Sequence, residues 1–197
     1  MPTATLPALP SSPPFSWLQR LLAALALLGV LSCMAVGAQQ GATVGNMPER
    51  SVKAAFLYKF LAYIDFPGDP GPNLVVGVLG ADELAAELAQ VTAGRAVGNR
   101  SIVVRPLKEG DPLGGVQLLF IGAEAARPLQ ALRSANQNCI LTVTEQDNGL
   151  QQGSAINFRV VDERVRFEVS LPAAERCNVK LSSRLLSVAY FVQKGGQ

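Results

Sequence analysis

Apolar residues between positions 48 and 150 recur with two different periods that alternate along the chain. Steps of three and four residues predict three helices: one that begins at Pro48 and ends before Pro67, one after Asp82 and one that contains Pro128. Continuous apolar runs predict four strands, which lie at 74–80, 102–104, 116–122 and 139–145. Because helices and strands alternate at this spacing, we expect βαβ units and a mostly parallel sheet flanked by helices.

The pattern changes to strict alternation toward the C-terminus. Apolar and polar residues alternate at 156–160 and again at 165–171, and Asp162 and Glu163 separate the two runs. This arrangement predicts a C-terminal β-hairpin with a two-residue turn. The polar residues of its second strand share one face, and they are Arg164, Arg166, Glu168 and Ser170.

A last helix is expected over residues 182–192, where apolar residues again recur at helical spacing. Ser182 or Ser183 is the predicted N-cap, because a serine hydroxyl can accept a hydrogen bond from the first free backbone N–H groups. No repeat, linker or composition change divides the chain after residue 48. We therefore expect one α/β domain over residues 48–194.

The residues before this domain follow the pattern of an export signal. Positions 21–31 form an apolar run that is too short to span a bilayer, which takes about 20 residues. Small residues follow at 36–38, at the spacing of a cleavage site. We predict a signal peptide at 1–38, a flexible polar lead-in at 39–47, and a mature domain in the periplasm that does not insert into the membrane. The alternative is lipoprotein processing, which would anchor the protein at Cys33.

Composition limits the kinds of catalysis and metal binding that are open to this protein, because the sequence contains no histidine. Histidine is the commonest general base and metal ligand near neutral pH, so histidine-dependent hydrolases and the usual zinc enzymes are excluded. The glycines at 77 and 80 do not form the dinucleotide-binding motif, and the carboxylates lie at expected caps and turns. Basic residues are scattered singly, which does not suggest nucleic-acid binding. We expect no catalytic residues, no cofactor and no metal site.

Two small sets of residues are left as candidates for a site. Cys139 and Cys177 would form one disulfide bond in an oxidising compartment, or would be two buried thiols that never meet. Glu168 lies in the middle of a hairpin strand, and Lys180 and Arg184 follow it closely. These three residues form either a solvated face or a site for a small ligand or a partner. The apolar face of the first helix is wide enough for both core packing and an oligomer or partner contact.

Four parts of the chain together resemble the YfiR-like family of periplasmic regulators. They are 53–60 running into 66–67, then 76–80, 116–122, and 166–169 followed by 179–186. The resemblance covers residues 49–192, and it lies in the order and spacing of the segments more than in any one of them. Two positions depart from the family pattern: Phe66 replaces a frequent tryptophan, and no cysteine begins the 116–122 strand.

The resemblance implies a Rossmann-like domain that forms a homodimer. It further implies that the protein binds and represses the periplasmic domain of an inner-membrane diguanylate cyclase, which lowers cyclic di-GMP signalling and biofilm formation. An alternative is a periplasmic module whose small ligand changes its dimerisation or its affinity for a partner. The candidate ligand- or partner-binding residues under either function are Tyr63, Phe66, Glu168, Lys180, Ser182 and Arg184.

Overall fold

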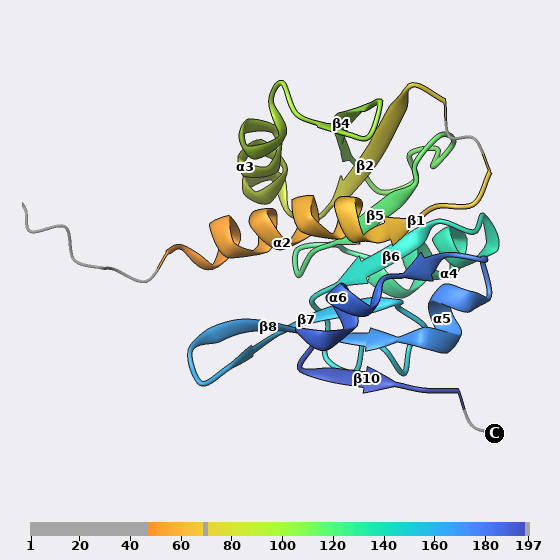
Figure 1. Ribbon diagram of the computed structural model, residues 1–197. Helices are drawn as coiled ribbons and strands as arrows, with labels where there is room; N and C mark the ends of the chain where they lie inside the picture. Colours follow the sequence, from red (N-terminus) through yellow and green to blue (C-terminus); the bar gives the residue numbers. More distant parts are fainter. Residues whose placement is uncertain (1–46, 69–70, 196–197) are drawn as a thin grey trace, which may run out of the picture. The chain divides into compact units, whose positions relative to one another are not determined.

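The computed structural model describes residues 47–68 and 71–195 of the chain. The predicted signal peptide and Cys33 lie outside these residues, as does the predicted lead-in except for Met47. Within the described part, helices cover both faces of an eight-stranded sheet, and a separate two-stranded sheet completes the fold (Figure 1).

The large sheet is mostly parallel. In spatial order its strands are β10 (Phe191–Gln193), β8 (Arg164–Ser170), β7 (Ile156–Val161), β6 (Leu141–Thr144), β5 (Leu118–Ile121), β2 (Asn73–Leu79), β4 (Arg100–Leu107) and β3 (Ala96–Val97). The pairs β7–β8 and β3–β4 are antiparallel, and the other five neighbouring pairs are parallel. The α/β fold class predicted from the sequence is therefore confirmed.

Two hydrophobic cores lie on opposite faces of this sheet. The three long helices are α2 (Glu49–Tyr63), α3 (Asp82–Thr92) and α4 (Pro128–Gln137). Alternate residues of β5 belong to different cores: Leu118 and Phe120 pack with α2 and α3, whereas Leu119 and Ile121 pack with α4. This is why the strand is apolar at every position, as a strand covered by helices on both faces must be.

The wide apolar face of α2 is used mainly in the first core. Phe56 and Phe60 pack against Phe158 of β7 and Phe167 of β8. The ring centroids of Phe60 and Phe167 are 5.0 Å apart in an edge-to-face arrangement, which favours aromatic pairs beyond their buried area. The exposed stripe of the helix consists of Ala55, Lys59 and Ala62.

The predicted hairpin is present as β7 and β8. Val161 pairs with Arg164, so Asp162 and Glu163 form a two-residue turn. Both turn residues have positive φ angles, 50° and 58°, as the turn type that matches the twist of hairpin strands requires. In Figure 1 the hairpin extends to the left, in the same direction as the start of α2.

The predicted last helix is wrong in length. Ser182 caps α6 (Ser183–Ser187), as expected, and its side chain accepts a hydrogen bond from the N–H of Leu185. The helix then stops, and the chain forms β10 beside β8. The reason is tertiary: β8 offers an open edge of backbone groups, and the N–H of Tyr190 donates to the carbonyl oxygen of Phe167 at 2.8 Å. Aromatic residues at 190–191 also favour a strand.

The strand predicted at 102–104 is longer in the structure, because β4 continues through Pro106 to Leu107. Proline lacks a backbone N–H and normally ends a central strand. On the side away from β2, however, β4 pairs with β3 only at Arg100 and Ser101. Pro106 therefore lies where β4 is an edge strand, and the missing N–H has no strand to face.

Candidate functional site

A short antiparallel sheet brings five of the six predicted ligand- or partner-binding residues into one region. Its strands are β1 (Ile64–Asp65), directly after α2, and β9 (Lys180–Leu181), which follows the short helix α5 (Leu171–Glu175). Asp65 pairs with Lys180, and the N–H of Ser182 donates to the carbonyl oxygen of Tyr63 at 3.0 Å. We call Tyr63, Phe66, Lys180, Ser182 and Arg184 the β1–β9 surface.

The β1–β9 surface combines half-buried aromatic rings with exposed cations. Tyr63 and Phe66 pack on the first core while part of each side chain reaches solvent. Lys180 and Arg184 are exposed, and neither forms an ion pair with any residue that the structure describes. Such a surface offers anchoring side chains and free positive charge to an acidic group, and it contains no activated nucleophile.

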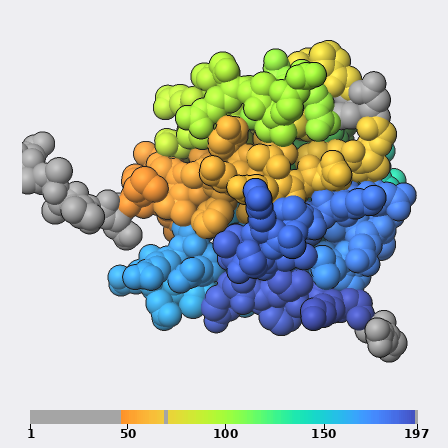
Figure 2. Space-filling model, viewed as in Figure 1, coloured from red at the N-terminus to blue at the C-terminus, as the bar shows by residue number. Residues whose placement is uncertain are grey.

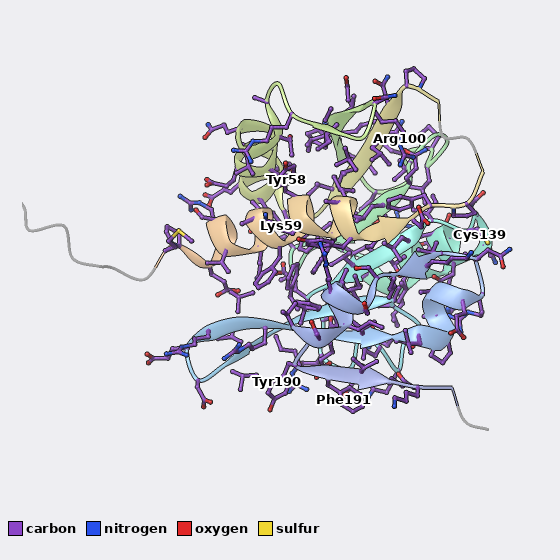
Figure 3. All side chains as sticks on the ribbon, in the orientation of Figure 1. Tyr58, Lys59, Arg100, Cys139, Tyr190 and Phe191 are labelled. Carbon is purple, nitrogen blue, oxygen red and sulfur yellow. The ribbon has the colours of Figure 1, made fainter. Side chains whose placement is uncertain are left out.

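Other elements border the same surface. Helix α2 packs against α6, and its exposed stripe carries Lys59 (Figure 3). Figure 2 shows α2, in orange, directly beside the dark blue C-terminal segment. Lys59 was not among the residues selected from the sequence, although its position between Ala55 and Ala62 on one helical stripe could have indicated it.

The structure places Glu168 away from this surface. Its neighbour Phe167 points toward α2, so Glu168 points to the opposite face of the sheet. There its carboxylate accepts a hydrogen bond from the guanidinium of Arg159 at 3.0 Å. The Glu168 side chain is 13% exposed and that of Arg159 is 57% exposed. Glu168 is therefore held by a neighbouring strand and is not grouped with Lys180 and Arg184.

A second polar cluster, which was not selected from the sequence, lies at the carboxyl end of β6. Glu145 accepts a hydrogen bond from the N–H of Ala123 at 2.7 Å and pairs with the ammonium of Lys53, which also pairs with Glu49. The side chains of Lys53 and Glu145 are only 13% and 15% exposed. Burial disfavours the charged form of Lys53, but its bonds to Glu145 and Glu49 outweigh burial and raise its pKa above 10.5.

This cluster lies beside the crevice where open α/β sheets usually bind ligands, at the point where the strand order reverses. Here that point is between β2 and β5. The two loops that follow these strands approach so closely that a Cβ atom on Gly122 would lie 2.2 Å from the carbonyl oxygen of Gly80. Backbone therefore closes the gap between these two loops. Beside them a cavity of about 480 Å³ stays open, and Lys53, Gly80, Ala123 and Glu145 are among the residues that line it. The approach of two loops cannot be read from a single sequence, but an acidic residue directly after a buried strand is a visible signal.

The two cysteines lie near each other. Cys139 is exposed in the turn after α4 (Figure 3), and Cys177 is half-buried just after α5. Both are free thiols in the structure. Burial, together with the interaction with the thiol of Cys139, raises the pKa of Cys177 to about 11. Cys177 Sγ lies 3.9 Å from the carbonyl oxygen of Asn136, which also accepts from the N–H of Cys139. The predicted disulfide bond stays a prediction.

Comparison with known families decides the identity of the domain. Residues 50–190 match the YfiR/HmsC-like family model, which is most of the chain. The protein belongs to the YfiR/HmsC-like family. Members of this family are periplasmic regulators of diguanylate cyclase signalling rather than enzymes, and they interact with membrane signalling proteins. No curated protein matches the chain.

A solved structure supports the fold of this YfiR/HmsC-like domain. The chain is similar to a conserved domain protein from Vibrio cholerae, with a TM-score of 0.53 and 10% sequence identity. The similarity covers 73% of this chain and 60% of that one, so the chain spans less than two thirds of the structure it matches. At this identity the likeness concerns the fold. Among the described residues, none of the helices is long and apolar enough to cross a membrane.

Proposed function

We propose that this protein is a periplasmic repressor that binds the external domain of an inner-membrane diguanylate cyclase and lowers its activity. Less cyclic di-GMP and less biofilm formation follow from that repression. The observation that carries the proposal is the family match over residues 50–190, which spans nearly all of the described domain. The protein acts as a homodimer in this proposal, as its resemblance to the family implies.

The β1–β9 surface is the proposed contact with the cyclase. Arginine and aromatic side chains are enriched among residues that dominate binding energy, and Tyr63, Phe66 and Arg184 are of these types. Lys180 and Arg184 form no ion pair within the described part of the chain, so their charges favour an acidic patch on the partner, because complementary charge speeds encounter and fixes orientation. Ser182 supports the surface by capping α6.

Deletion of the gene tests the proposal directly. We expect cellular cyclic di-GMP, measured by mass spectrometry, to rise on deletion and to return to the starting level when the wild-type protein is restored. Cross-linking in intact cells should join the protein to a membrane protein with a diguanylate cyclase domain. An unchanged cyclic di-GMP level, together with no cross-link to such a protein, would contradict the proposal.

A second function has support from the same exposed cations. A small anionic metabolite that binds Lys180 and Arg184 would change the affinity of the β1–β9 surface for its partner. A thermal-shift screen of periplasmic metabolites distinguishes this function from simple repression. A ligand at 100 times its Kd should stabilise the fold by about 2.7 kcal/mol, and that shift should vanish in Arg184→Ala. A shift that persists in Arg184→Ala would place the ligand elsewhere.

A further inference from the structure

The fold brings together two cysteines that are 38 residues apart in the chain. Cys139 is in the turn between α4 and β6, where its backbone has a φ angle of 51°. Cys177 follows α5, and its Sγ lies 3.9 Å from the carbonyl oxygen of Asn136, three residues before Cys139. The backbone N–H of Cys139 donates to the same carbonyl oxygen at 3.3 Å, so the two cysteines share one acceptor. One thiol is exposed and the other is half-buried, so a reagent can reach the pair from the side of Cys139.

We propose that Cys139 and Cys177 form a disulfide bond in the exported protein, and that this bond anchors the segment that leads into β9. The proposal rests on the proposed function only through export, since disulfide bonds persist in oxidising compartments. It assigns to this pair a covalent role in supporting the β1–β9 surface.

The segment that would be anchored has only a short strand pairing. Strand β9 pairs with β1 over only two residues, Ile64 with Leu181 and Asp65 with Lys180. Cys177 precedes Lys180 by three residues, so a bond at Cys177 fixes the base of this strand. The other end of the bond is on a different layer, because α4 belongs to the second core whereas Val179 belongs to the first. The bond would tie the two layers together at the end of the sheet where β6 begins.

The bond forms by thiol–disulfide exchange with a thiol oxidase that carries a reactive disulfide. The exposed Cys139 thiolate attacks that disulfide, which gives a mixed disulfide and releases one oxidase thiolate. The Cys177 thiolate then attacks the sulfur of Cys139, which releases the second oxidase thiolate. The two protein thiols lose two electrons and two protons, and the oxidase disulfide is reduced to a dithiol.

The second exchange step should be slow in the folded protein. Burial, the largest cause, raises the pKa of Cys177 and still acts once Cys139 is held in the mixed disulfide, although the guanidinium of Arg176 lowers that pKa in part. Little Cys177 thiolate is then present near neutral pH, and the rate of ring closure should rise as the pH is raised. Measuring loss of free thiols in the presence of oxidised glutathione gives this rate.

The decisive experiment is a peptide map of the full chain purified from its host without reductant. Free thiols are first blocked with iodoacetamide and the protein is cut with trypsin. We expect one cross-linked species that joins residues 134–159 to residues 177–180, and we expect dithiothreitol to separate it. Alkylation of both Cys139 and Cys177 in protein recovered from outside the cytoplasm would overturn the proposal and leave the proposed function intact.

If the protein is not exported, that result contradicts the proposed function. Oxidation of the purified protein in vitro then tests whether the disulfide bond can form. Incubation with oxidised glutathione should produce the same cross-linked species, and its absence would overturn the proposal. The double variant Cys139→Ser with Cys177→Ser is the control, and Cys33→Ser should still form the bond.

The anchoring role has its own measurement. Reduction of the bond should lower the Tm by about 10 °C and should speed hydrogen exchange at Lys180 and Leu181, but not at the buried strand β5. Dithiothreitol should have no effect on either quantity in the double serine variant. Equal Tm values and equal exchange for oxidised and reduced wild type would overturn the anchoring role.

Discussion

Two groups of charged side chains in this domain differ in how completely the fold pairs them. Lys53 and Glu145 are nearly buried, and each has a charged partner and a fixed place beside the ends of β2, β5 and β6. Lys180 and Arg184 are exposed, and no described residue carries a charge that pairs with them. Burial with full pairing indicates a structural role, whereas exposure without pairing leaves the charge for a partner.

The largest effect on stability should come from Lys53→Met. The substitution leaves the Glu145 carboxylate nearly buried with only the N–H of Ala123 as a partner. Loss of one member of a buried ion pair costs about 3 kcal/mol or more, so we expect the free energy of unfolding in urea to fall by about 3 kcal/mol. Lys59→Met, on the exposed stripe of the same helix, is the control and should change stability by less than about 0.5 kcal/mol.

The pH dependence of stability tests the same pairing by titration. Because the pKa of Lys53 is raised in the folded state, its charge contributes fully to stability below its ordinary value of 10.5. That contribution is lost as the pH rises through the folded-state pKa. The wild type should therefore lose more stability above pH 10.5 than Lys53→Met does. Parallel curves for the two proteins would contradict a structural role for the ammonium group.

A smaller loss of stability should follow from Gly122→Ala, at the contact between the loops that follow β2 and β5. The new Cβ would lie 2.2 Å from the carbonyl oxygen of Gly80 and 2.7 Å from the Cβ of Ala81, so the two loops must separate. Overpacking of this kind costs about 2 kcal/mol. Gly114→Ala is the matched control, because a Cβ there meets nothing within 4 Å. A stable Gly122→Ala protein would mean that the two loops can separate, and would weaken the argument that their close contact is required by the fold.

Sequence pattern predicted the parts of the fold that depend on local periodicity. The all-apolar run at 116–122 predicted β5, and alternation around Asp162 and Glu163 predicted the hairpin, because burial on two faces or one leaves a direct pattern. The end of the chain was mistaken for helix because residues 185–192 also fit a helical period. Residues 191–193 form a strand because the open edge of β8 pairs with them, and this edge is a tertiary feature that the local pattern does not contain.

The candidate site, like the fold, could be predicted from the sequence only in part. Tyr63 and Lys180 are more than 100 residues apart, and the family resemblance, not the spacing, grouped them before the β1–β9 pairing brought them together. The grouping of Glu168 with Arg184 failed because proximity in sequence does not specify which face of a sheet a side chain takes. Lys53 and Glu145 were missed because their pairing depends on where α2 crosses the ends of the strands.

Arg159→Ala should have a moderate effect that sharpens the comparison. The Glu168 side chain would lose its one ion-pair partner among the described residues while it stays largely buried. Since Arg159 itself is mostly exposed, we expect a loss of about 1 kcal/mol in the free energy of unfolding. Arg166→Ala is the control, because Arg166 lies directly opposite Arg159 and like charges in that position repel. Its removal should leave stability unchanged or raise it slightly, and an equal loss in both variants would contradict the specific role of the Arg159–Glu168 pair.

The smallest effect on stability, and the largest on function, should come from Lys180→Gln combined with Arg184→Gln. Both side chains are exposed and form no ion pair with a described residue, and glutamine places no like charge opposite Asp65 across the β1–β9 pair. The free energy of unfolding should therefore change by less than about 0.5 kcal/mol. If these charges face an acidic partner, the neutralised protein should reach normal abundance yet leave cyclic di-GMP near the level of the deletion strain. Arg133→Gln, on an exposed position of α4, should restore repression as the wild type does. Repression by the Lys180 and Arg184 variant at wild-type strength would remove the β1–β9 surface from the interface, because these two charges are its proposed contact with the acidic patch.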